Sequence, residues 1–146
     1  MLNDLKDNIE IVSGTWQELE TSAKAIRTEV FIHEQNIPEN DEWDVLDATS
    51  IHFIVWMNGQ AIATARLLEN NSIGRVAVLK EYRGLGVGNK LMQAVIALAK
   101  AQNRPFVKLS SQVHAIGFYQ ALGFVVQGEE YLDCGIPHID MSLILS

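Results

Sequence analysis

The pattern of apolar and polar residues changes along this sequence, and the changes mark its elements. Short apolar runs bounded by turn residues predict strands at residues 9–12, 51–57, 61–68 and 72–79. Between the first two runs, apolar residues from Trp16 to Val30 recur at intervals of three and four, which predicts one amphipathic helix. Thr15 and Glu18 have the spacing of a capping box at its start. The dipeptide Asn58-Gly59 predicts a tight hairpin turn.

The second half of the chain predicts a strand, a helix and a further strand. Residues 89–102 place apolar side chains on one helical face, and residues 106–110 follow as a strand. We expect this strand to lie parallel to residues 75–79, because a helical crossover joins the two. A helix ending at Gly123 and strands at 124–126 and 138–145, separated by residues 128–137, complete the prediction.

These elements predict an α/β fold built on a single, mixed, mostly antiparallel sheet flanked by helices. The segment between the first helix and residue 51 is acidic and contains Pro38, so we expect loop or short helical turns there. At 146 residues, the chain is long enough to bury one core, and we expect one domain over residues 1–146.

A glycine-rich loop, Arg83-Gly84-Leu85-Gly86-Val87-Gly88, joins the strand at 72–79 to the helix at 89–102. Glycines allow a tight turn and a close approach by a ligand, and the following helix directs unpaired N–H groups and its positive dipole end into the same space. Arg83 adds a positive charge. This arrangement suits a phosphate or pyrophosphate. A Walker A loop is excluded because Asn89-Lys90 follows the last glycine, and the glycine spacing does not fit a dinucleotide fingerprint.

The loop resembles the acetyl-CoA loop of the GCN5-related N-acetyltransferases, in which Arg or Gln precedes two residues, Gly, one residue, and Gly or Ala. Arg83, Gly86 and Gly88 match this pattern in register. A second segment, residues 115–124, is similar to the family's later helix and strand, whose mark is Phe-Tyr, three residues, then Gly-Phe. Both segments occur in the family's order. The resemblance implies the family's fold and transfer of an acetyl group from acetyl-CoA to an amine of a small molecule or peptide.

The resemblance also implies roles for single residues. The loop residues Arg83, Gly84, Leu85, Gly86, Val87 and Gly88 would hold the CoA pyrophosphate, and main-chain groups of Val76, Ala77 and Val78 would pair with the pantetheine arm. One of those N–H groups would polarise the acetyl carbonyl. Phe118 would lie beside the coenzyme, and Gln112 stands where many relatives carry an asparagine that bonds the pantetheine amide. Tyr119 would donate a proton to the departing thiolate.

The residue that takes the amine proton is less marked in the sequence. Glu34 follows the first helix, near the family's acceptor site, and is a candidate base or substrate contact; its alternative is a solvated carboxylate. His52, His114 and His138 have suitable pKa values, although each also fits a hydrogen-bonded core or rim histidine, and we assign His138 to substrate binding. The amine can also arrive deprotonated. The histidines have no metal-site spacing, so we expect no metal.

The first half also resembles the acyl-homoserine-lactone synthases. Arg27, Phe31, the acidic stretch at 42–47 and Arg66 fall in the order of that family's marked residues, which shape a site for an S-adenosylmethionine amine. We therefore include Phe31 and Arg66 as substrate-binding candidates. The alternative is an ion-pair cluster that pins the acceptor-side loop. A synthase of this kind and a non-catalytic CoA-binding module are the alternative functions.

Composition narrows the choice of partners. The net charge of −7 argues against nonspecific binding to nucleic acid. No apolar run reaches membrane-spanning length, and the polar residues 1–7 lack a signal peptide's apolar core, so we expect no membrane partner. The single cysteine, Cys134, fits a reducing cytoplasm. Dimers are common in the acetyltransferase family, which leaves a homodimer as a further expectation.

Overall fold

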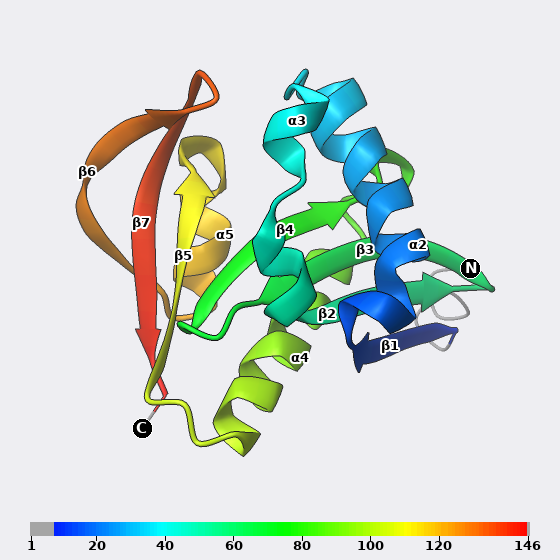
Figure 1. Ribbon diagram of the computed structural model, residues 1–146. Coiled ribbons are helices and arrows are strands. Elements are labelled where there is room, and N and C mark those ends of the chain that lie inside the picture. The colour runs from blue at the N-terminus through cyan, green and yellow to red at the C-terminus, as the bar shows by residue number, and fades with distance from the viewer. Residues whose placement is uncertain (1–7, 146) are drawn as a thin grey trace.

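The computed structural model describes residues 8–145, in which seven strands form one mixed sheet with helices on both faces (Figure 1). The strand order is β1-β2-β3-β4-β5-β7-β6, and β4 and β5 form the parallel pair. The strands are β1 (Ile9–Gly14), β2 (Ile51–Met57), β3 (Gln60–Leu67), β4 (Ser72–Val78), β5 (Phe106–Gln112), β6 (Val125–Asp133) and β7 (Ile136–Ile144). The predicted fold class is confirmed. The polar segment at residues 1–7 lies outside the described residues.

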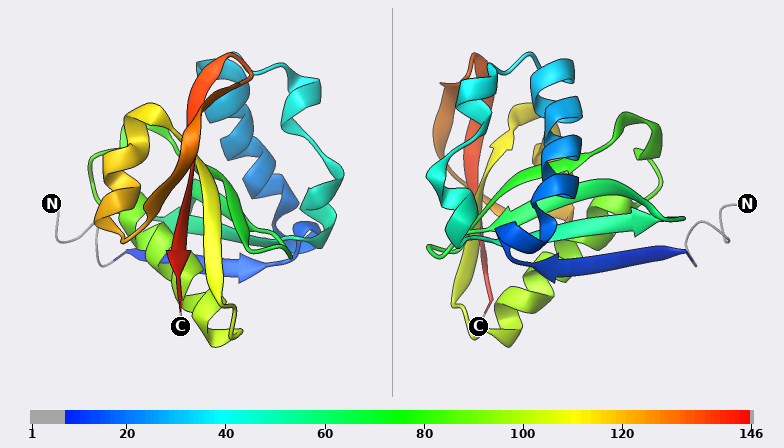
Figure 2. Two further views of the ribbon diagram at one scale, coloured as in Figure 1. Left: turned by 90° about the vertical axis from the view of Figure 1, so that its left-hand side faces the viewer. Right: turned by 45° about the vertical axis from the view of Figure 1, so that its right-hand side comes forward.

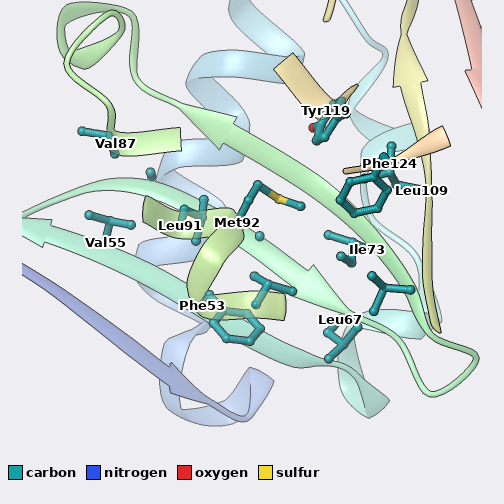
Figure 3. Packing of buried hydrophobic residues seen from close by; sticks show 14 of the residues in the cluster. Phe53, Val55, Leu67, Ile73, Val87, Leu91, Met92, Leu109, Tyr119 and Phe124 are labelled. Atoms are coloured by element: carbon teal, nitrogen blue, oxygen red, sulfur yellow. The ribbon is translucent and has the colours of Figure 1, made fainter. Parts of the chain in front are cut away.

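Different helices cover the two faces of the sheet (Figure 2). Helix α2 (Trp16–Arg27) packs on β2, β3 and β4 from one side, where Ala23, Ile26 and Ile54 are buried. Helix α4 (Val87–Ala101) and the short helix α5 (Ile116–Ala121) lie on the other side. Figure 3 shows the larger core there, where Leu91 and Met92 of α4 meet side chains of the sheet. Within residues 8–145, no helix has both the length and the apolar content to cross a membrane.

Several local predictions are confirmed. Thr15 accepts a hydrogen bond from the Glu18 N–H, and Glu18 accepts one from the Thr15 N–H, so the capping box is complete. Asn58 and Gly59 both have positive φ, 52° and 79°, as a two-residue hairpin turn requires. Gly123 follows α5 with φ 102°, which places it as the C′ residue.

The first helix is shorter than predicted. Helix α2 ends at Arg27 and continues as a π-helical turn, η1 (Thr28–Glu34), in which Gln35 N donates to Val30 O five residues back. Over so short a segment, a π-helical turn keeps nearly the same apolar spacing as an α-helix, so the sequence pattern does not distinguish the two. Two short helical turns, α3 (Glu39–Glu42) and η2 (Val45–Thr49), follow as expected for the acidic segment.

The last two strands are longer than predicted. Residues 128–137 were expected to connect them, but β6 and β7 extend through this segment and turn at Cys134 and Gly135. These two residues have φ of 51° and 77°, which is the conformation of a two-residue hairpin turn. Gly128, the first residue of the expected connection, instead lies at a register shift inside β6 with φ 79°. This glycine therefore marks a bulge.

The parallel pair is also much shorter than predicted. Strands β4 and β5 are paired at Ser72 with Lys108 and at Ile73 with Leu109, and not along residues 75–79. Beyond this point the two strands diverge, as Figure 1 shows. The sheet is therefore open between the second half of β4 and the second half of β5.

Candidate active site

A bulge in β4 opens the sheet. Thr64 pairs with Ala77 and Arg66 with Gly74, so two residues of β4, Arg75 and Val76, lie opposite the single residue Ala65. Arg75 has φ 51°, in the left-handed region that side-chain-bearing residues avoid. A bulge of this kind bends its strand, which accounts for the separation of β4 from β5.

The bent half of β4 presents main-chain groups to the opening. Leu79 N donates to Ile62 O, which places Val78 and Ala63 in a non-hydrogen-bonded pair. The N–H and C=O of Val78 therefore point away from β3, toward the side from which β5 has diverged. This is the geometry of a sheet edge that can accept one more extended chain.

The glycine loop lies directly after this edge. Gly84 and Gly86 have φ of 79° and 82°, and a Cβ at either would have nothing within 4 Å, so both lie against open space. Gly86 is the N-cap of α4, and Lys90 N donates back to Gly86 O. Among the described residues, no partner accepts from the N–H groups of residues 87–89. They lie at the positive end of a 15-residue helix, where an anion is stabilised.

Arg83 does not offer a free charge to this space. Its Nη1 and Nη2 donate to the two carboxylate oxygens of Glu34 at 2.6 and 2.7 Å, and its Nε donates to Val78 O at 2.9 Å. The Arg83 hydrogen bonds lower the pKa of Glu34, and Glu34 raises that of Arg83. The sequence suggested Glu34 and Arg83 as candidates for two different roles. In the structure they form one bidentate pair that joins the end of η1 to the edge of β4.

Phe118 and Tyr119 lie beside the same loop. A Cβ on Gly88 would be 3.5 Å from Phe118 Cζ and 3.8 Å from Val78 Cγ2, so α5, the start of α4 and β4 meet here. The rings of Phe118 and Tyr119 are in edge-to-face contact, with centroids 5.0 Å apart. Phe118 is partly exposed, whereas Tyr119 is buried in the core shown in Figure 3.

The Tyr119 hydroxyl has no hydrogen-bond partner among residues 8–145. Burial raises its pKa to about 12. The hydroxyl is therefore protonated at neutral pH. Among residues 8–145, the side-chain atoms that are fully buried and make no hydrogen bond are Nε of Arg66 and Nε of Arg75. The Tyr119 hydroxyl is not one of them, so it retains some exposure to open space. Such a group can donate a hydrogen bond to a bound molecule.

Gln112, at the end of β5, is held on the opposite side of the opening. Its Nε2 donates to Gln35 Oε1 at 2.9 Å, and its Oε1 lies 2.7 Å from His114 Nε2. Glu34 and Gln35 are neighbours, so the end of η1 contacts the β4 side through Arg83 and the β5 side through Gln112. Gln35 was missed in the sequence, which offers no signal for a contact between residues 77 positions apart.

His138 lies next to Gln112 across the β5–β7 ladder. Its Nδ1 is 2.7 Å from Ile136 O, and since a carbonyl only accepts, Nδ1 carries the proton and Nε2 has a lone pair. Tyr131 stacks on this ring at 6.2 Å and hydrogen-bonds to Asp140. His52 is different: its Nε2 is 2.9 Å from Asp47 O inside the protein, and burial lowers its pKa. His138 is 9% exposed and neighbours Gln112 in the ladder, and His114, whose Nε2 lies 2.7 Å from Gln112 Oε1, is the second candidate histidine at this position.

The two other substrate-binding candidates lie in the interior. Phe31 belongs to the buried cluster between α2 and the sheet, which also contains Ala77. Arg66 is 4% exposed and donates to Asp44 and Asp47 at 2.7 to 2.9 Å. Its contacts are those of the ion-pair cluster that the sequence allowed as the alternative reading of this segment.

The comparisons with known proteins agree with this geometry. The family model for the acetyltransferase (GNAT) domain matches residues 16–145. ElaA of Escherichia coli is 34% identical to this chain over 145 residues, which cover 87% of the chain and 94% of ElaA. The N-acetyltransferase YjcF of Bacillus subtilis, itself uncharacterized, is 36% identical over 120 residues, covering 80% of the chain and 86% of YjcF.

Solved structures extend the similarity. An acyl-CoA N-acyltransferase from Pseudomonas aeruginosa superposes with a TM-score of 0.83 at 33% identity, covering 92% of this chain and 98% of that one. The acyl-homoserine lactone synthase BjaI, solved with SAM and isopentyl-CoA, gives a TM-score of 0.80 at 14% identity, covering 94% and 84%. At that identity the synthase shares the fold alone.

Proposed function

The chain belongs to the GNAT acetyltransferase family and is an acyltransferase, and we propose that it moves an acetyl group from acetyl-CoA directly to a primary amine of a small molecule or peptide. The observation that carries the proposal is the open main-chain edge of β4, which leads into an anion-binding helix start with Tyr119 beside it. We place the enzyme in the cytoplasm, where a lone cysteine such as Cys134 stays reduced.

The residues present fit the coenzyme. Gly84 and Gly86 leave open space over the loop, and the N–H groups at the start of α4 have no partner within residues 8–145, as a diphosphate requires. Since Arg83 is neutralised by Glu34, the affinity for the diphosphate would come from main-chain N–H groups and the helix dipole. The edge at residues 76–78 would pair with the pantetheine amides in the manner of an added strand.

The coenzyme would supply an activated thioester, and the protein would supply polarisation and proton management. In the overall step, the amine nitrogen bonds to the acetyl carbon, the carbon–sulfur bond breaks, the amine loses one proton and the sulfur gains one. A main-chain N–H on the β4 edge would stabilise the carbonyl oxygen as it gains charge.

Tyr119 would stabilise the departing sulfur. With a pKa of about 12, its hydroxyl is a weaker acid than a thiol, whose ordinary pKa is about 8.5. Full proton transfer from Tyr119 to a thiolate is therefore uphill, and donation of a hydrogen bond is the role that its pKa supports. The sulfur would then take its proton from solvent.

Removal of the amine proton needs a base with a free lone pair. Glu34 is engaged on both oxygens by Arg83, and its pKa is lowered, so it accepts a proton poorly. We therefore propose that Glu34 positions Arg83 and the end of η1. Nε2 of His138 is the better proton acceptor, because Ile136 O holds the proton on Nδ1.

Calorimetry with acetyl-CoA, followed by thiol release with a panel of amines, tests the proposal. We expect saturable binding by the wild-type protein, much weaker binding by Gly86→Val, and thiol release with at least one acceptor among polyamines, aminoglycosides, amino acids and peptides. Absence of any heat from acetyl-CoA would refute the assignment. Binding without turnover across the panel would favour a CoA-binding module, and turnover dependent on S-adenosylmethionine would favour a lactone synthase.

A further inference from the structure

A partly buried cluster of six charged residues lies between α2, the acidic segment and the sheet. Its members are three arginines and three acids, so the formal charges balance: Arg27, Arg66, Arg75, Glu42, Asp44 and Asp47. Arg27, Glu42, Asp47 and Arg66 are 1 to 4% exposed. Because charges removed from water need paired partners, each side chain in the cluster holds its neighbours in place.

Arg75 connects this cluster to the bulge of β4. Its Nη2 donates to Glu42 O at 2.7 Å and lies 3.4 Å from Asp44 Oδ2. Its Nε is 3.0 Å from Glu42 Oε2, an ion-pair contact without hydrogen-bond geometry, and that oxygen accepts a hydrogen bond from Arg27 Nε at 2.8 Å. Arg75, which has the left-handed backbone conformation in the bulge, is thus bonded through its side chain to α3 and to the loop after it.

The backbone of Arg75 requires such an anchor. Its φ of 51° is one that L-residues with a Cβ rarely adopt, and a regular strand would be favoured by the local backbone alone. A regular β4 would continue alongside β5, and the main-chain groups of residues 76–78 would then face a strand. The guanidinium contacts oppose this change.

We propose that Arg75 is a positioning residue for acyl-CoA. Its side-chain contacts with Glu42 and Asp44 hold the β4 bulge, and the bulge directs the main chain of residues 76–78 into the opening beside β5. The inference rests on the proposed function, because it assigns the acyl-CoA arm to this edge. It also means that the acidic segment supports the reaction although it does not contact the substrate.

Three substitutions separate the side chain from the backbone. Arg75→Gly removes the anchor and also removes the steric cost of positive φ, so its bulge depends least on the anchor. Arg75→Ala removes the anchor and keeps the cost, and Arg75→Lys keeps a charge without the planar fork. The matched control is Arg104→Ala, since Arg104 also donates to a carbonyl, Leu68 O at 2.6 Å, but lies at the other end of the sheet opening.

The readouts are the calorimetric Kd for acetyl-CoA, the separate KM values for acetyl-CoA and amine, and amide hydrogen exchange at residues 76–78 in the free protein. We expect Arg75→Ala to lower kcat/KM for acetyl-CoA by about 10- to 100-fold, as misplacement by about 1 Å does elsewhere, and Arg75→Gly to lower it less, because glycine adopts positive φ without an anchor. The KM for the amine should change less than about twofold, Arg75→Lys should be intermediate, and Arg104→Ala should match the wild type.

Two outcomes overturn the inference. One is an Arg75→Ala protein that binds and uses acetyl-CoA like the wild type, whatever its melting temperature. The other is an Arg104→Ala protein with the same defect as the Arg75→Ala protein, since the effect would then be general destabilisation. If the wild-type protein itself gives no heat with acetyl-CoA, the proposed function fails first, and unchanged amide exchange at residues 76–78 in Arg75→Ala then refutes the anchor independently.

Discussion

Replacing Gly86 with alanine should weaken the hold on acetyl-CoA, whereas replacing Gly88 with alanine should make the free protein more stable and leave binding nearly unchanged. Gly88 lies in the first turn of α4 with ordinary helical backbone, and an added Cβ would meet Phe118 at 3.5 Å, an ordinary van der Waals contact. Alanine in a helix is more stable than glycine by roughly 0.5–1 kcal/mol, so we expect the unfolding free energy to rise by about 0.5 kcal/mol.

Binding separates the two variants. The acetyltransferase pattern accepts Gly or Ala at the position of Gly88, so Gly88→Ala should bind acetyl-CoA within about twofold of the wild type. Gly86 has φ of 82° and lies against open space, so alanine is strained there and its methyl group would enter the space expected for the diphosphate. Loss of one hydrogen bond to a charged group costs about 1.5–3 kcal/mol, so the Kd of Gly86→Ala should weaken by roughly 10- to 100-fold.

Denaturant titration and calorimetry measure the two quantities on the same samples. The reasoning is refuted if the Gly86→Ala protein binds acetyl-CoA within about twofold of the wild type. That result would mean that the diphosphate does not lie on the start of α4.

The other predictions concern single side chains. Tyr119→Phe should lower kcat by about 100- to 1000-fold and leave the melting temperature unchanged, because no described residue bonds its hydroxyl; a kcat near the wild-type value would exclude the role of Tyr119. His138→Gln should lower kcat at pH 7 by about 100-fold, with a smaller loss at higher pH, where more of the amine arrives deprotonated; equal losses at all pH values would argue against His138 as the base. The Arg66 hydrogen bonds lower the pKa of Asp44 from 3.8 to about 2, so its stabilising contribution is complete above pH 4 and is lost as the pH falls toward 2. Since Asp44 is one-third exposed, the gap in unfolding free energy between wild type and Asp44→Asn should be about 1 kcal/mol larger at pH 6 than at pH 2; a gap independent of pH would contradict the pKa shift.

Some parts of the candidate site can be predicted from the sequence, and others cannot. Gly84 and Gly86 are visible because positive φ selects glycine, and the capping box is visible because it needs two residue types at a fixed spacing. Arg75 has the same kind of backbone conformation but is not glycine, so nothing in its identity marks the bulge. Glu34 and Arg83 were each candidates, yet their pairing reverses the reading of both, because a neutralised arginine attracts a phosphate less and an ion-paired carboxylate is a poor base.

The order of strands and helices and the glycine loop follow from the sequence by itself, because short-range spacing and turn chemistry act over a few residues and can be read along the chain. The sequence also shows the family, through its resemblance to known acetyltransferases. The opening between β4 and β5, the contacts of Glu34 and Gln35 across it and the charged cluster behind Arg75 depend on contacts between residues 15 to 77 positions apart. Such contacts exist only once the sheet has brought distant segments together. The tertiary structure therefore decided where the acyl donor is expected to bind and which side chains are free to act on it.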